Sequence, residues 1–256
     1  MTWLQPLRFP QLDDAMRLTR IYFSEPLTAD SNVLLPKETS HYLANVLRLK
    51  AGDTILLFNE SNGEFLATIN EVRKGGVSTI VAEQRRAPAG SEVSIELGLG
   101  LSKGDRMDYG IQKSVEMGVT AITPVNCEFG EVRFKQAARV ENKLRHWRRV
   151  AVSATEQSGR LDVAPIEAPQ NISDWLGSSK ASTRLCLDPA AEVRLGDQPL
   201  SDSVAVLIGP EGGFSEAELA LAESSGFTRV TLGPRILRTE TAPVAALAVI
   251  QHLLEN

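Results

Sequence analysis

The chain has 256 residues, of which 43% are hydrophobic and 23% charged, and its formal net charge is −5. This composition excludes a mainly disordered chain, and the length suits two domains. The longest uncharged apolar run, residues 241–254, is too short to cross a bilayer and contains Pro243. No secretory signal opens the chain, and the cysteines and histidines form no disulfide or metal-binding pattern. We therefore expect a soluble cytoplasmic protein with no metal and no membrane partner.

The N-terminal third predicts a small β-rich domain. Residues 1–15 show no periodicity, and we expect them to be a non-native or flexible extension, with Met16 as the biological start. One helix, residues 38–47, places apolar side chains on one face. We expect residues 16–88 to form a small barrel of the kind that often holds RNA. Turn residues separate five strand candidates: residues 20–23, 33–35, 54–58, 64–71 and 77–84.

A linker that contains the helix and strand breakers Pro88 and Gly90, residues 85–91, leads into a second domain, residues 92–256. Strand and helix patterns alternate there, which predicts an α/β domain with a mostly parallel sheet covered on both faces. A capping box of Ser215 and Glu218 opens one helix, and Gly226 ends it. The other expected helices are residues 106–117, 136–157 and 244–254. The expected strands are residues 93–101, 119–125, 184–187, 204–208 and 229–232.

The distribution of charge is more informative than its sum. Between residues 133 and 160 lie eight basic and only two acidic residues, which leaves a local excess of six positive charges. A net acidic protein can bind RNA through such a patch, because phosphate contacts are local. A solvated helix face is the alternative explanation.

Two loops at the carboxyl ends of predicted strands carry residues that turn chemistry does not explain. Residues 208–214 hold three glycines and a proline, which let the backbone approach a ligand closely, and Glu211 lies among them. Residues 232–242 place Arg235, Arg238 and Glu240 just before the last helix, a suitable place for an anion. Ligands of open α/β sheets bind at these strand ends.

Two further segments are more ambiguous. Residues 156–160 end the long basic helix, so Gln157 and Arg160 can point into a cleft, although ordinary helix C-terminal chemistry explains them as well. Residues 98–104 follow a strand with the spacing GxGxxxG, which differs from the GxGxxG of dinucleotide-binding enzymes. No acidic residue ends the next strand, so a nicotinamide enzyme is the weaker hypothesis.

Taken together, these motifs resemble the SPOUT methyltransferases, in particular the RsmE family, which methylates N3 of a uridine in small-subunit ribosomal RNA. Residues 208–213 and 232–242 carry the strongest similarity. Residues 126–130 depart from the Glu-Arg-rich loop of the family. Further matches run in the same order from Arg20 to the C-terminus: residues 41–43, 46–48, 103–108, 112–113, 116–118, 147 and 156–160.

The resemblance implies a trefoil knot in about residues 180–256, with S-adenosyl-L-methionine bound inside it. It also implies a homodimer, a PUA-like RNA-binding barrel at the N-terminus, and 16S rRNA or the assembled 30S subunit as partner. The residues it assigns to the cofactor are Leu187, Ile208, Gly209, Pro210, Glu211, Gly212, Gly213, Leu232, Gly233, Ile236, Leu237 and Arg238. Those assigned to RNA are Arg20, His41, Arg48, Lys103, Arg106, Arg145, Arg149 and Arg160.

The implied chemistry also suggests catalytic residues. N3 of uridine is a poor nucleophile while protonated, so an enzyme must remove the proton or stabilise the anion. Arg235, Arg238 or Arg160 can stabilise the anion, and Glu240 can orient an arginine or accept the proton. The target base must turn out of its stack to reach the pocket. The alternative is a knotted RNA-binding assembly factor without catalysis.

Overall fold

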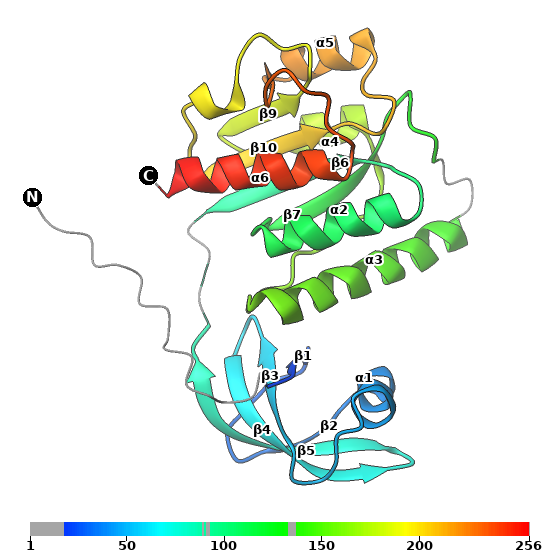
Figure 1. The fold of residues 1–256 in the computed structure, drawn as a ribbon, viewed down its shortest axis with the longest axis vertical. Helices are drawn as coiled ribbons and strands as arrows, with labels where there is room; N and C mark the ends of the chain where they lie inside the picture. Colours follow the sequence, from blue (N-terminus) through cyan, green and yellow to red (C-terminus); the bar gives the residue numbers. More distant parts are fainter. Residues whose placement is uncertain (1–17, 89, 91–92, 133–136, 256) are drawn as a thin grey trace, which may run out of the picture. The chain divides into compact units, whose positions relative to one another are not determined.

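The computed structural model describes residues 18–88, 90, 93–132 and 137–255 (Figure 1). The chain divides into two compact units, Met1–Pro88 and Ala89–Asn256. The expected extension and Met16 lie outside the described residues, as do Arg133 and Lys135 of the basic cluster. Each unit has its own hydrophobic core.

The N-terminal unit is built on a five-stranded sheet in the order β1-β3-β4-β5-β2. β1 runs parallel to β3, and the other neighbouring pairs are antiparallel. Ile55, Leu57, Ala67 and Ile69 alternate along two of these strands and point into the core. All five predicted strands are confirmed: β1 (Arg20–Tyr22), β2 (Asn32–Leu34), β3 (Thr54–Asn59), β4 (Gly63–Arg73) and β5 (Gly76–Arg86).

The predicted helix of this unit is present in two parts. α1 (Lys37–His41) is α-helical, and η1 (Tyr42–Val46) continues it as a π-helical turn. Leu43 is fully buried in the core, which fixes the turn to the sheet. The chain then leaves through Arg48 in the left-handed region, at φ 57°. The apolar spacing thus predicted the helix, but it did not predict the change from α-helical to π-helical hydrogen bonding.

The C-terminal unit is built on a six-stranded sheet in the order β11-β9-β10-β6-β7-β8. Every neighbouring pair is parallel, as the alternation of strands and helices predicted. The strands are β6 (Ser94–Gly100), β7 (Ala121–Asn126), β8 (Gln170–Asn171), β9 (Thr183–Leu187), β10 (Ser203–Ile208) and β11 (Thr228–Val230).

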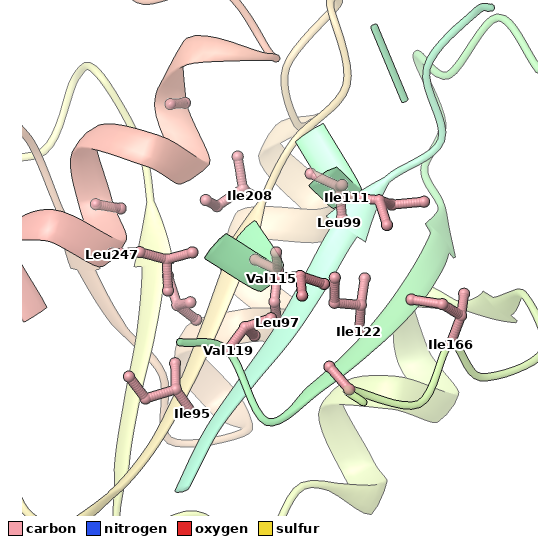
Figure 2. Close-up of a cluster of buried hydrophobic side chains, with 14 of the residues drawn as sticks. Ile95, Leu97, Leu99, Ile111, Val115, Val119, Ile122, Ile166, Ile208 and Leu247 are labelled. Carbon is pink, nitrogen blue, oxygen red and sulfur yellow. The ribbon is translucent and has the colours of Figure 1, made fainter. Parts of the chain in front are cut away.

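Helices cover both faces of this sheet. Val204, Val206 and Ile208 of β10 join a core with α2, α3 and α6, while Ala205 and Leu207 join a core with α4 and α5. Figure 2 shows the first of these cores around β6 and α2. The helices are α2 (Asp105–Glu116), α3 (Ala137–Ser158), α4 (Ile172–Ser178), α5 (Glu216–Ser224) and α6 (Thr241–Leu254).

The capping box at the start of α5 is confirmed. The Ser215 hydroxyl accepts from the Glu218 backbone N–H at 3.3 Å, and the Glu218 carboxylate accepts from the Ser215 N–H at 2.9 Å. Three short elements were not predicted: β8, α4 and the 3₁₀ turn η2 (Leu195–Asp197). Each is too short to show a clear period, so hydrophobic spacing alone does not identify it.

Candidate active site

A cavity of about 570 Å³ lies where β9, β10 and β11 end. Leu187 and Ile208 are the last residues of β9 and β10, and Thr231 follows β11. Because these strands are parallel, their carboxyl ends meet at one edge of the sheet, where ligands of open α/β sheets bind. The two loops that the sequence analysis singled out therefore border one continuous cavity.

The glycine loop, residues 209–213, forms one wall of the cavity and is fixed from behind. A Cβ at Gly100 of β6 would lie 2.4 Å from the backbone nitrogen of Pro210. A Cβ at Gly212 would lie 2.7 Å from Cβ of Phe129, so that glycine also permits a close approach. The Thr239 hydroxyl donates to the carbonyl of Gly209 at 3.0 Å. These contacts hold backbone groups of the loop at the cavity edge.

The same contacts account for the GxGxxxG pattern. Gly98 and Gly100 lie inside β6 and not in a loop after it. A Cβ at Gly98 would lie 2.8 Å from the ring of Trp175. These glycines therefore make room for Trp175 and for the loop at Pro210, which is a packing role and not phosphate binding.

A buried carboxylate that the sequence did not single out also lines the cavity. Asp188 directly follows β9, and its Oδ2 accepts from Arg229 Nε at 2.9 Å and from Arg229 Nη2 at 2.5 Å. The bond to Asp188 raises the pKa of Arg229. Asp188 Oδ1 accepts from the backbone N–H of Ala190 at 3.0 Å. The carboxylate is thus held in one orientation at the cavity wall.

The opposite wall, residues 235–240, presents exposed side chains. Ile236 is 86% exposed, and the Arg238 side chain is 82% exposed. Arg238 lies 3.9 Å from Glu240, whose carboxylate is mostly covered. Such an exposed ion pair is weak, so the guanidinium is available to a ligand. Arg235 lines the same wall.

An ion pair closes one side of the cavity. Arg106, from the first turn of α2, donates to the Glu211 carboxylate at 3.0 Å. Both residues line the cavity. Arg106, expected to bind RNA, is therefore already engaged with the glycine loop.

The structure brings most of the expected site residues together. Of the residues expected to bind the cofactor, only Gly212 and Gly233 are not among those lining the cavity. The ones that line it are Leu187, Ile208, Gly209, Pro210, Glu211, Gly213, Leu232, Ile236, Leu237 and Arg238, joined by Arg235 and Glu240. Phe214, Thr239 and Ala242 lie in the two loops singled out from the sequence but were not assigned a role, and Leu219 and Thr231 were missed. Asp188 and Pro189 begin the loop after Leu187, where the resemblance implies a cofactor contact without naming residues. The position of Asp188 and Pro189 directly after a parallel strand was a usable signal for those two.

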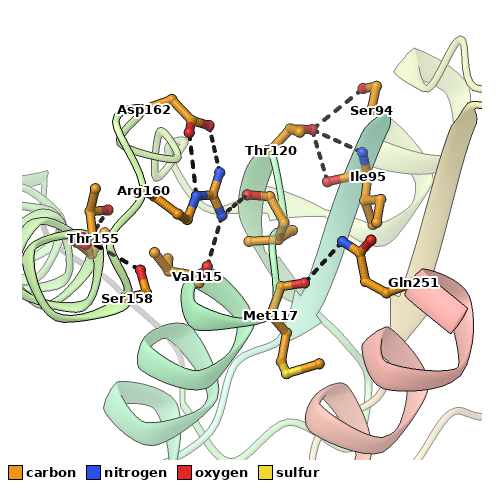
Figure 3. Close-up of polar contacts among 12 residues, drawn as sticks. Ser94, Ile95, Val115, Met117, Thr120, Thr155, Ser158, Arg160, Asp162 and Gln251 are labelled. Atoms are coloured by element: carbon orange, nitrogen blue, oxygen red, sulfur yellow. Dashed lines mark hydrogen bonds and ion pairs between the residues drawn. The ribbon is translucent and has the colours of Figure 1, made fainter. Parts of the chain in front are cut away.

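Arg160 does not line this cavity. Its Nη1 donates to the carbonyls of Val115 and Val119 at 2.7 and 2.8 Å, and its Nη2 bonds Asp162 at 2.6 Å (Figure 3). The guanidinium thus bonds one backbone carbonyl in the last turn of α2 and one in the loop that follows the helix. Arg160 was expected to point into a cleft. In the structure its side chain instead caps the end of α2.

The remaining residues expected to bind RNA lie on both units. Arg20 is paired with Glu64 at 2.7 Å and lies 4.2 Å from the centre of the Phe58 ring. His41 and Arg48 are exposed on the N-terminal unit. On the C-terminal unit, the exposed residues are Lys103, Arg145 and Arg149.

Neither a metal centre nor a membrane span is found in the described part of the chain. No cluster of three or more His, Cys, Asp or Glu side chains among the described residues is suited to hold a metal ion. No helix in the described ranges is long and apolar enough to cross a membrane.

Comparison with known proteins agrees with this geometry. The sequence profile of an RNA methyltransferase domain matches residues 89–251, and that of an RNA methyltransferase PUA domain matches residues 35–81. The chain is 35% identical to the ribosomal RNA small subunit methyltransferase E of Buchnera aphidicola subsp. Schizaphis graminum, over 92% of this chain and 96% of that protein.

Two solved structures are similar along nearly their whole length. One is a methyltransferase from Legionella pneumophila with bound S-adenosylmethionine, 35% identical, with a TM-score of 0.89 over 93% of this chain and 98% of that one. The other is the ribosomal RNA small subunit methyltransferase E of Neisseria gonorrhoeae bound to S-adenosylmethionine, 36% identical. Its TM-score is 0.85, over 92% of this chain and 98% of that one.

Proposed function

This chain belongs to the family of ribosomal RNA small subunit methyltransferase E, and from that premise we propose that it methylates N3 of one uridine in 16S ribosomal RNA. Membership makes it an rRNA methyltransferase that uses S-adenosylmethionine. The observation that carries the proposal is the cavity at the ends of β9, β10 and β11, bordered by a rigid glycine loop and an exposed arginine.

The cavity suits this cofactor. Its volume of about 570 Å³ falls within the range of pockets that enclose small ligands. Backbone groups of residues 209–213 can read an adenine without side chains, and Leu187, Leu232 and Leu237 supply apolar walls. S-adenosylmethionine, when bound, supplies an activated methyl group on a sulfonium.

We assign the chemistry on the acceptor side to the exposed wall. Arg238 or Arg235 stabilises the negative charge that N3 and its flanking carbonyl oxygens gain as the proton leaves. Glu240, 3.9 Å from Arg238, either orients that guanidinium or accepts the proton. Charge stabilisation, and the proton transfer if Glu240 accepts the proton, are thus both assigned to residues 235–240.

The knot remains part of the proposal. The segment after β11 runs beside the loop after β9, since Leu195 donates to the carbonyl of Thr231 at 2.9 Å and Thr231 donates to that of Val193 at 2.8 Å. Further along, Thr239 donates to Gly209. Residues 231–239 thus contact residues 188–197 on one side and the glycine loop on the other, which supports a chain segment threaded between them. We also propose a homodimer that acts in the cytoplasm, on free 16S rRNA or on the 30S subunit.

Nucleoside mass spectrometry tests the proposed position of methylation. Small-subunit RNA from cells lacking the protein should contain no 3-methyluridine, and re-expression should restore it. Re-expression of Arg238→Ala should not restore it, although the variant should still bind S-adenosylmethionine in calorimetry. Retained 3-methyluridine in the deleted strain would overturn the assignment to N3. A wild-type protein that binds no S-adenosylmethionine would favour a non-catalytic assembly factor.

A further inference from the structure

A second hollow, of about 380 Å³, lies in the C-terminal unit between the start of α2 and the first half of α3. Lys103, Arg139 and Lys143 line it, together with the carboxylate of Glu131. Met107 and Trp147, both almost fully buried, complete its lining. The hollow therefore combines an apolar base with a predominantly cationic rim.

The spacing along α3 explains why these residues share the hollow. Arg139, Lys143 and Trp147 are each four residues apart, so they lie on one helical face. Arg145 and Arg149 lie two residues to either side of Trp147, which turns them to the opposite face. The basic helix is thus divided into two sets of cations, and only one set lines the hollow.

The charge of the hollow is not balanced internally. Lys103 Nζ lies 2.5 Å from Glu131 Oε2, and this bond lowers the pKa of the Glu131 carboxyl. Among the described lining residues, one carboxylate therefore faces three cations, which leaves a local excess of two positive charges. Arg139 is exposed and Lys143 half-buried. An anion that entered here would find cations already positioned.

The hollow and the cofactor cavity share a wall. Ser102 lines the hollow, and its hydroxyl lies 3.3 Å from the hydroxyl of Thr239, which lines the cavity. The Ser102 hydroxyl also donates to the carbonyl of Gly100 at 3.2 Å. Gly100 in turn packs against Pro210 of the glycine loop. One pair of hydroxyl groups therefore connects the lining of the hollow with that of the proposed cofactor cavity.

We infer that this hollow is a phosphate-binding subsite for the RNA strand, holding a phosphodiester next to the nucleotide that is methylated. The inference rests on the proposed function, because it takes RNA as the substrate. A base turned out of its stack leaves its own phosphates displaced, and cations beside the cavity hold them in place. Arg139, Lys143 and Lys103 position the acceptor base while residues 235–240 act on it.

The first test neutralises the α3 cations of the hollow one at a time and compares them with a control outside it. Arg139→Gln and Lys143→Gln should each weaken binding of radiolabelled 30S subunits, purified from cells lacking the protein, by roughly tenfold. The plot of log affinity against log salt concentration should become less steep, by about 0.7–0.9 in slope for each phosphate that the variant no longer neutralises. Lys180→Gln, which removes the same charge from an exposed loop position outside both cavities, should behave as wild type.

The second test uses the internal carboxylate. Glu131→Gln releases Lys103 and removes the one negative charge of the hollow, so affinity for 30S subunits should rise several-fold. If the Lys103–Glu131 ion pair had only a structural role, its removal would not favour RNA, and the affinity for 30S subunits would fall instead of rising. A fall in 30S affinity on Glu131→Gln would therefore contradict the inference. Calorimetry with S-adenosylmethionine should give the wild-type affinity for all of these variants.

The outcomes separate this inference from the proposed function. If wild type binds 30S subunits but transfers no methyl group to them, the proposed function fails, and the affinities of the variants still decide on the subsite. If Arg139→Gln and Lys143→Gln weaken binding no more than Lys180→Gln does, binding does not depend on the cations of the hollow and the subsite is wrong. A wild type that does not bind 30S subunits overturns both.

Discussion

The two walls of the proposed cofactor cavity are built in opposite ways. The glycine loop, residues 209–213, packs against Gly100 and Phe129 and accepts a hydrogen bond from Thr239. The facing segment, residues 235–238, holds its isoleucine and arginine side chains out to solvent. One wall is fixed before any ligand arrives, and the other keeps its polar groups available.

This difference indicates a division of labour. A rigid backbone wall binds a constant ligand at low entropic cost, which suits a cofactor. An exposed arginine with one weak partner binds strongly only when the substrate is present, which suits stabilisation of developing charge. We therefore expect substitutions on the two walls to affect different measured constants.

Arg238→Ala should have the largest effect on turnover. Loss of a donor to the developing anion lowers kcat by about 10²–10³-fold, while affinity for S-adenosylmethionine stays near the wild-type value. Single-turnover methylation of 30S subunits and calorimetry measure the two quantities separately. Arg238→Lys keeps the charge but loses the planar fork, so its rate should lie between the two. A parallel loss of cofactor affinity would contradict the division between the walls.

Gly100→Ala should produce the reverse pattern. The new Cβ would lie 2.4 Å from the backbone of Pro210, so the glycine loop must move. We expect a loss of about 1–3 kcal/mol in the free energy of unfolding and at least a roughly tenfold loss of S-adenosylmethionine affinity. Gly177→Ala in α4 is the matched control, because its Cβ meets nothing within 4 Å. If Gly100→Ala bound S-adenosylmethionine as tightly as wild type, cofactor binding would not depend on the fixed position of the glycine loop.

Arg160→Ala extends the comparison to a buried arginine. The Arg160 side chain is 14% exposed, and it bonds the backbone carbonyls of Val115 in α2 and of Val119 in the loop that follows. Its removal should lower the free energy of unfolding by about 2 kcal/mol and leave kcat of the folded protein near wild type. Urea unfolding and single-turnover rates measure the two effects. A large loss of kcat with normal stability would return Arg160 to the catalytic role expected from sequence.

The sequence predicted most of the fold because the relevant signals are local. Period-2 and period-3.6 patterns located the strands and helices, and Ser215 and Glu218 marked the start of α5. The glycine loop was visible because three glycines exceed what a turn needs. β8 and α4 were missed, since two and seven residues give too little pattern.

The site was less predictable where it depends on contacts between distant residues. Arg160 bonds carbonyls 45 and 41 positions earlier in the chain, and nothing near Arg160 in sequence indicates that contact. The Thr239 hydroxyl donates to Gly209, 30 positions earlier, and nothing in the sequence near Thr239 indicates that contact. The sequence of α3 showed how many positive charges the helix carries but not where each one points. Only the packing of Trp147 shows which cations face the hollow.

The smallest expected effect concerns two thiols behind the rigid wall. Cys186 lies one residue before Leu187, and Cys127 lies two residues before the Phe129 that packs on Gly212. Burial, the largest cause, raises the pKa of each thiol from 9.0 to about 12. A folded-state pKa above the unfolded value means that this stability is present below pH 9 and is lost as pH rises toward 12.

At pH 10, each thiol should therefore remove about 1.4 kcal/mol from the free energy of unfolding. Urea unfolding at pH 8 and pH 10 measures this loss in wild type, and the loss should shrink by that amount for each thiol replaced in Cys127→Ala and Cys186→Ala. The difference between the two pH values cancels the packing cost of the substitutions themselves. An identical loss in wild type and in both variants would mean that the thiols ionise freely. The wall behind the cofactor would then be open to solvent, and the contrast between the two walls would disappear.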